Sequence, residues 1–217
     1  MNAKVECLQI RGEASRWRAL GLTVTDDGTI PLIGTSLQLV SPTVPEADLS
    51  GKSAITGWAL SGVTAPGESA SEGLLIDGLP TTIVPAGAPI FAAHELTASG
   101  LDHVVIQTSD LERTSTAISE LTGSELKRIR EVGSMRQGFH RIGRGGLVVE
   151  LVERPEVPEG PAAFWGFVIN VDDLDLACEG LGTDQVSPPK DAVQPGRRIA
   201  TIRKDVGLGI PIALMST

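Results

Sequence analysis

Cysteine is scarce in this sequence, and long apolar runs are absent from it. Only Cys7 and Cys178 occur, far apart and without a Cys-x-x-Cys pair, so a disulfide framework and a thiolate zinc site are excluded. Each cysteine is expected to be a small buried hydrophobe. No apolar run approaches the roughly 18 residues that a membrane span needs, and the N-terminus MNAKVECLQI lacks the regions of a secretory leader. We therefore expect a cytoplasmic protein without a membrane partner.

Basic residues are the minority among the charged ones. The chain has 18 Lys and Arg against 27 Asp and Glu, which gives a net charge of -9, and both halves of the chain are acidic. Nucleic-acid binding depends on clustered Lys and Arg that release counterions from phosphates. A nucleic-acid partner is therefore disfavoured, and a small-molecule ligand is expected.

The chain of 217 residues is long enough for two modest domains, and an internal repeat supports that division. The segment LQLVSPTVPEADLSGKSAITGWALSGV (37–63) aligns with VELVERPEVPEGPAAFWGFVINV (149–171), and Val-Pro-Glu recurs in both. Turn residues punctuate the stretch PAGAPIFAAHELTA (85–98) between the halves. We predict domains at 1–90 and 99–217, joined by a linker at 91–98 in which His94 is exposed.

A finer repeat lies within the second half. Residues 101–121 and 164–181 each combine an alternating strand, Asp-Leu and a helical stretch, and strands with tight turns follow each helix. Asp110 is expected to cap the first helix, and Asp172 or Asp173 the second. The sequence therefore predicts an α+β fold of tandem paired βαβββ modules. Residues 1–90 are expected to form a degenerate copy in which the loop 64–73 replaces the second helix.

This order of elements, with a histidine in LDHVVIQTS and a glutamate in VVELV, resembles the vicinal oxygen chelate superfamily. That superfamily contains glyoxalase I, fosfomycin and bleomycin resistance proteins, methylmalonyl-CoA epimerase and extradiol dioxygenases. The resemblance implies modules that form an open cup, in which up to four strand side chains bind a divalent metal. His103 and Glu150 match the first two ligand positions. The third falls at Gly166 or Trp165 and the fourth at Ala213, where no such ligand stands.

In the N-terminal domain the resemblance places the corresponding positions near Cys7, Gln38, Gly57 and Thr82, which form a poorer set. That domain is expected to be a structural or interface partner. Many members of the superfamily assemble the cup from two chains, so a homodimer is a further expectation that four modules in one chain leave open.

His103 and Glu150 alone make a weak metal site, because a metal needs roughly four to six donors. His140, in GFHRIG, is the best third donor that the sequence offers, and the metal would be one divalent ion such as Ni, Mn, Fe or Zn. Without a metal, His103 and Glu150 are either a satisfied pair that lines the pocket or an acid–base pair, and the sequence does not separate these alternatives.

Ligand contacts are expected from an arginine and from aromatic residues. Arg141 belongs to a group of arginines that could clamp a carboxylate or phosphate at the rim of the pocket, although a solvated face explains such a group equally well. Trp165 and Phe167 could form an aromatic wall if they face the cup, and core packing is the alternative.

Two functions follow. The first is a lyase or isomerase in which His103 and Glu150, with or without a divalent metal, polarise a substrate oxygen or move a proton. The second is a non-catalytic protein that binds or sequesters a small molecule such as a drug. An extradiol dioxygenase is the least expected enzyme, because its iron needs two histidines and a carboxylate.

Overall fold

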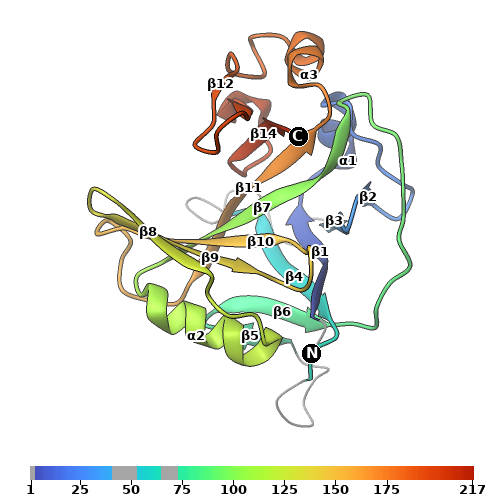
Figure 1. Cartoon of the computed structure of the whole chain (residues 1–217). Coiled ribbons are helices and arrows are strands. Elements are labelled where there is room, and N and C mark those ends of the chain that lie inside the picture. Colours follow the sequence, from blue (N-terminus) through green and yellow to red (C-terminus); the bar gives the residue numbers. More distant parts are fainter. Residues whose placement is uncertain (1–2, 41–52, 65–72) are drawn as a thin grey trace.

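The computed structural model describes residues 3–40, 53–64 and 73–217, which form two sheets packed together (Figure 1). The N-terminal sheet has six strands in the order β2-β3-β1-β4-β6-β5. Its elements are β1 (Lys4–Arg11), α1 (Ala14–Ala19), β2 (Thr29–Leu32), β3 (Thr35–Val40), β4 (Ile55–Ser61), β5 (Leu74–Ile76) and β6 (Leu79–Ile83).

The C-terminal sheet has eight strands in the order β12-β13-β14-β11-β7-β10-β9-β8. Its first module is β7 (Ala98–Thr108), α2 (Leu111–Thr122), β8 (Arg128–Val132), β9 (Met135–Arg141) and β10 (Val148–Glu153). Its second module is β11 (Ala163–Val171), α3 (Leu174–Leu181), β12 (Lys190–Asp191), β13 (Arg198–Thr201) and β14 (Ile212–Ser216). The first strands of the two modules, β7 and β11, pair antiparallel in the middle.

The prediction of an α+β fold with paired βαβββ modules is confirmed. Within the described part of the chain, each N-terminal module has one strand fewer than its C-terminal counterpart, which is how the first copy is degenerate. The Val-Pro-Glu at 44–46 and most of the predicted loop 64–73 lie outside the described residues.

The helix starts follow local capping rules. Asp110 accepts a hydrogen bond from the backbone N–H of Arg113 at 2.9 Å, and Asp173 accepts one from Leu176 at 2.9 Å. Each carboxylate satisfies an N–H group that has no partner within its helix. Asp110 is therefore the predicted cap of α2, and Asp173 is the one of the two candidates, Asp172 and Asp173, that caps α3.

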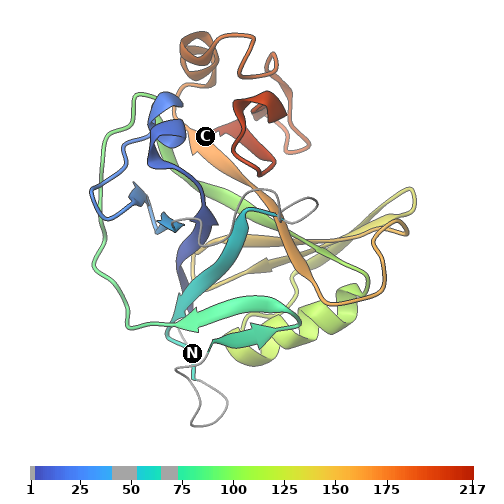
Figure 2. The ribbon, with the colours of Figure 1, turned by 180° about the vertical axis from the view of Figure 1, so that it is seen from behind.

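Aromatic side chains join the two sheets. Trp17 of α1 stacks on Phe167 of β11 with ring centroids 6.4 Å apart, and Trp58 of β4 meets Phe164 edge to face at 5.4 Å. One hydrophobic core extends across both sheets. In the view from behind, β4 runs alongside β11 (Figure 2). The domain boundaries at 90 and 99 remain a prediction.

The composition of the connection from β6 to β7 predicts a linker in which His94 is exposed. In the structure His94 is buried. The connection runs along the N-terminal elements (Figure 1), and His94 is only 9% exposed. Nδ1 of His94 accepts a hydrogen bond from the N–H of Thr23 at 3.0 Å, and Nε2 donates to the carbonyl of Pro31 at 2.7 Å. Because both ring nitrogens are satisfied, this histidine anchors the connection. None of the described helices is long and apolar enough to span a membrane.

Candidate active site

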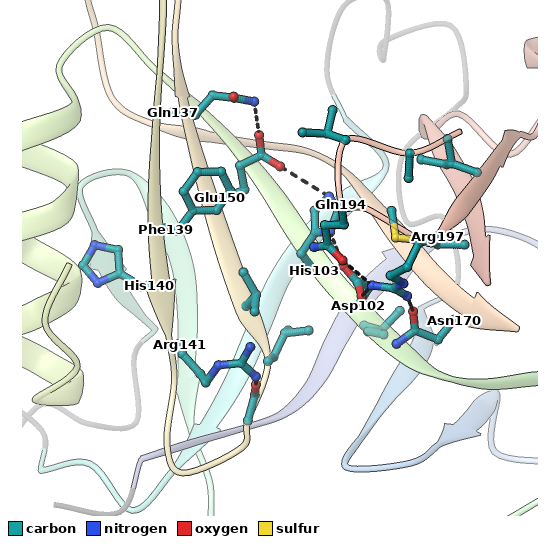
Figure 3. A pocket seen from close by; sticks show the side chains of 18 of the residues that line it. Asp102, His103, Gln137, Phe139, His140, Arg141, Glu150, Asn170, Gln194 and Arg197 are labelled. Atoms are coloured by element: carbon teal, nitrogen blue, oxygen red, sulfur yellow. Dashed lines mark hydrogen bonds and ion pairs between the residues drawn. The ribbon is translucent and has the colours of Figure 1, made fainter. Parts of the chain in front are cut away.

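A cavity of about 1000 Å³ opens on one face of the C-terminal sheet. Strands of both modules line it, and the N-terminal sheet contributes Ile33 and Gly34 from the turn between β2 and β3 and Thr35 from the start of β3. Figure 3 shows that side chains from β7, β9, β10 and β11 converge on it. The cavity therefore corresponds in position to the cup that the sequence predicts.

His103 and Glu150 meet in this cavity because of the strand register. β10 runs parallel to β7, with Val148 opposite His103 and Glu150 two residues further along. Side chains two residues apart point to the same face of a strand. Nε2 of His103 lies 3.3 Å from Oε2 of Glu150 (Figure 3), and their side chains are 16% and 12% exposed, so both can be reached from the cavity.

Asp102 is a third member of this group, and no pattern in the sequence indicated it. Strict alternation would turn Asp102 away from the face that His103 occupies. In the pairing with β11, however, His103 lies opposite Val168 and Leu101 opposite Ile169, so Asp102 is the extra residue of a β-bulge. Such a bulge redirects a side chain. Oδ2 of Asp102 consequently lies 2.7 Å from Nδ1 of His103.

Arg197, which directly precedes β13, holds Asp102 from the opposite side. Its guanidinium donates to Oδ1 of Asp102, to Oδ1 of Asn170 at 2.6 Å and to the carbonyl of Ser216 at 2.7 Å (Figure 3). Burial alone would raise the pKa of Asp102, but the hydrogen bonds and charges of His103 and Arg197 outweigh it and bring the pKa from 3.8 to about 2. Asp102 is therefore an anion at neutral pH.

The charge of Asp102 decides which nitrogen of His103 carries a proton. An ionised carboxylate only accepts hydrogen bonds, so Nδ1–H of His103 must be the donor to Asp102. Nε2 is then the nitrogen that faces Glu150. Nε2 of His103 and Oε2 of Glu150, 3.3 Å apart, form a donor–acceptor pair when either atom carries a proton. Gln137 donates to the other oxygen of Glu150. This group can hold a proton at Nε2 or Oε2 and pass it to or from a ligand.

The third and fourth metal-ligand positions carry no donor. Gly166 lies opposite Val105 just as Val168 lies opposite His103, so Gly166 is the counterpart of His103 in the second module. A Cβ at Gly166 would come within 2.3 Å of the carbonyl oxygen of Pro211, so no side chain fits there. Ala213, opposite Val168, takes the fourth position.

These residues do not fit a resident divalent metal. His103 and Glu150 supply two donors, whereas a catalytic zinc site has three protein ligands and a non-haem iron site has two histidines and a carboxylate. No group of three or more His, Cys, Asp or Glu residues suited to a metal occurs in the described ranges 3–40, 53–64 and 73–217.

His140, the predicted third donor, belongs to the cavity wall, but its ring is directed away from Glu150. Glu150 lies opposite Phe139 in β9, so the next residue, His140, points to the other face and toward α2 (Figure 3). It is 1% exposed, and its ring contacts the carbonyl of Ser124 at 2.9 Å and Oγ of Ser115 at 3.0 Å. Burial lowers its pKa. Packing explains this residue, and metal binding by His140 stays a prediction that this geometry does not support.

The predicted aromatic wall is also absent from the cavity. Phe167 is buried against Trp17 on the opposite face of β11. Trp165 is the extra residue of a second bulge, between Phe164 and Gly166, and is 38% exposed outside the cavity. The aromatic residue in the cavity is Phe139, with the guanidinium of Arg128 4.8 Å from its ring centre.

Arg141 lines the cavity, and its contact with a ligand stays a prediction. Its guanidinium donates to the carbonyl of Gly146 at 3.1 Å. Arg136, from the same group of arginines, instead pairs with Glu112 and Glu153. Proximity in the sequence therefore did not indicate which arginine faces the cavity.

Paired βαβββ modules around a cup with a histidine on the first strand and a glutamate on the last define a protein of the vicinal oxygen chelate type. Residues 100–205 match the Glyoxalase/Bleomycin resistance protein/Dioxygenase superfamily. This part of the chain is therefore a domain of that superfamily.

Two solved structures illustrate the similarity. A triple mutant of 4-hydroxymandelate synthase from Streptomyces coelicolor is 15% identical, with 99% of this chain and 92% of that chain covered and a TM-score of 0.65. Methylmalonyl-CoA epimerase from Mycobacterium tuberculosis is 19% identical over 55% of this chain and 89% of its own, with a TM-score of 0.46. The first match shows that the fold extends over both halves. Among proteins of curated function, none is recognisably similar in sequence to this chain.

Proposed function

We propose that the protein is an acid–base enzyme of the lyase or isomerase kind that works on a small molecule in the cavity without a metal. The observation that supports this proposal is the line of Asp102, His103 and Glu150, in which one carboxylate orients the imidazole and the other lies 3.3 Å from its second nitrogen. A carboxylate that fixes the tautomer of a catalytic histidine is a common feature of such sites.

The chemistry follows from these atoms. Glu150 takes a proton from a substrate carbon next to a carbonyl: the C–H bond breaks, an O–H bond forms at Oε2, and the electron pair stays on the substrate as an enolate. Nε2 of His103, 3.3 Å away, can receive that proton or return it to the substrate at another position. The anionic Asp102 stabilises the imidazolium form in the meantime. Return of the proton gives an isomer, and expulsion of a leaving group gives a lyase product.

This proposal can be tested before the substrate is identified. Small carbonyl acids, hydroxy acids and thioesters are incubated with the protein in D₂O, and the loss of α-protons is followed by ¹H NMR. We expect exchange for at least one compound class with the native protein, and a loss of about 10²- to 10⁴-fold in Glu150→Gln and His103→Gln. Asp191→Asn removes another carboxylate that lines the cavity and should leave the exchange rate unchanged. Equal exchange rates in native protein and Glu150→Gln would overturn the proposal.

The second candidate is a binding or drug-sequestering protein without chemistry. It is favoured by the loss of ligand positions at Gly166 and Ala213, since the cavity persists where the metal set does not. Saturable binding of a compound by the native protein with no α-proton exchange would support this candidate. Three further parts of the proposal rest on the sequence alone. They are a cytoplasmic location, a small-molecule partner and a homodimer.

A further inference from the structure

The cavity has the opposite charge to the protein as a whole. Six basic side chains line it, namely Lys127, Arg128, Arg130, Arg141, Lys190 and Arg197, against the three carboxylates Asp102, Glu150 and Asp191. The chain carries a net charge of -9. In an acidic protein, a cavity with more basic than acidic side chains has a local positive potential that attracts anions.

Most of these cations have no carboxylate of their own. Arg197 is committed to Asp102, and Asp102 and Glu150 are both engaged with His103. Within the described ranges, none of the other five basic residues makes an ion pair. Of the three carboxylates that line the cavity, Asp191 makes no ion pair within the described residues, so the cavity keeps a basic excess after its internal pairs are formed.

Two of the arginines lie in register with the proton-transfer pair. Across three neighbouring strands, Arg128 is opposite Phe139, and Phe139 is opposite Glu150. Directly opposite residues share a face of the sheet, and adjacent strands are about 4.8 Å apart. The backbone of Arg128 is therefore roughly 10 Å from that of Glu150, two strand spacings away on the same face.

A second row of directly opposed residues crosses β9, β10 and β7. Arg141 is opposite Val148, and Val148 is opposite His103, so Arg141 is also two strands from a member of the pair. Both guanidiniums are already oriented, Arg128 by the ring of Phe139 and Arg141 by the carbonyl of Gly146. Figure 3 shows Arg141 at the same side of the cavity as Phe139.

We propose that the ligand carries a phosphate or phosphonate head group, bound between Arg128 and Arg141, while its other end reaches His103 and Glu150. Two guanidiniums present more donors and charge than one carboxylate can satisfy, whereas a phosphoryl group offers three acceptor oxygens and a charge of about -1.5 to -2. The location of the reacting end rests on the proposed function. The head-group site does not rest on the proposed function, because an anion can bind there without any reaction taking place.

The test compares three probes of similar length that differ in the head group: 3-phosphonopropionate, glutarate and butyrate. Dissociation constants are measured by isothermal titration calorimetry at fixed ionic strength. We expect affinity to fall in that order, and Arg128→Gln and Arg141→Gln each to weaken 3-phosphonopropionate by about tenfold or more while butyrate changes little. Thermal unfolding curves identify any variant that has lost its fold.

Arg144→Gln is the matched control. Arg144 lies in the same turn as Gly146, is exposed and does not line the cavity, and its replacement changes the net charge by the same amount. An equal loss of affinity in Arg144→Gln would overturn the site, because it would show only a general charge effect. Equal affinities for 3-phosphonopropionate and glutarate would overturn the phosphoryl assignment.

His103→Gln separates this inference from the proposed function. If that variant binds 3-phosphonopropionate normally and the native protein exchanges no α-protons, the head-group site stands and the acid–base function fails. If α-proton exchange is found but the three probes bind alike, the acid–base function stands and the head-group site fails.

Discussion

The carbonyl oxygen of Pro211 stands 2.3 Å from the place where a Cβ atom would project from Gly166. Gly166 is the counterpart of His103 in the second module, so backbone fills the space that a second metal-binding histidine would need. The absence of a ligand there follows from the packing of Pro211, the residue directly before β14, against Gly166, and one substitution cannot restore a ligand.

Gly166→Ala should therefore destabilise the protein. Overpacking against a backbone atom costs typically about 1–3 kcal/mol, which urea denaturation measures directly. Gly180→Ala is the control: Gly180 lies in α3 with open space around its Cβ position, and alanine is the better helix former by about 0.8–1 kcal/mol. Opposite signs are expected for the two variants, and two equal changes would contradict the packing argument.

Metal reconstitution should leave the protein without a stoichiometric ion. Protein purified without chelator and reloaded with Ni, Mn, Fe or Zn is expected to hold clearly less than one equivalent by elemental analysis, because His103 and Glu150 supply only two donors. Glu150→Ala serves as the comparison. One equivalent in the native protein that disappears in Glu150→Ala would show that water or another group completes the site.

Lowering the pH should reduce the stability of the folded protein through protonation of Asp102. The pKa of this carboxyl is about 2 in the folded protein against an ordinary 3.8, so the unfolded chain binds more protons between these values. Its contribution, about 2 kcal/mol, is present above pH 4 and is lost as the pH falls toward 2. Arg197→Met should shrink this loss between pH 4 and 2 in urea titrations.

The neighbouring Arg198 provides the control for that experiment. Arg198 pairs with Asp175 on the surface, and exposed pairs contribute about 0–1 kcal/mol. Arg198→Met should therefore keep the pH dependence of the native protein. The assignment of the acid-sensitive group to Asp102 fails if Arg197→Met and the native protein lose stability in parallel.

Neighbouring aromatic residues on β11 should differ sharply in their contribution. Phe167 is buried against Trp17, so Phe167→Ala should cost about 3–5 kcal/mol of unfolding free energy and loosen both sheets together. Trp165→Ala, on the exposed bulge, should change stability by about 0.5 kcal/mol or less. Comparable losses in the two variants would mean that the sheets do not depend on the Trp17–Phe167 contact.

The candidate site was only partly predictable. His103 and Glu150 could be placed in one cup because the resemblance to the superfamily assigns them to the first two ligand positions. The structure brings them to 3.3 Å, and their roles remain proposals. Asp102 could not be found, since a bulge overrides the alternation that assigned it to the other face. Arg197 lies 95 residues from Asp102 in the chain, and no local pattern connects them.

Local sequence was enough to determine the modules: period-two strands, the caps at Asp110 and Asp173, and the glycine at the end of α2 act over a few residues and need no distant partner. Tertiary structure alone decided which side chains share a cavity, because strand register, bulges and the packing of Phe167 on Trp17 depend on contacts between distant segments. A shift of one residue in a strand exchanges its two faces, so the face of His140 and the neighbours of His103 were beyond any local rule.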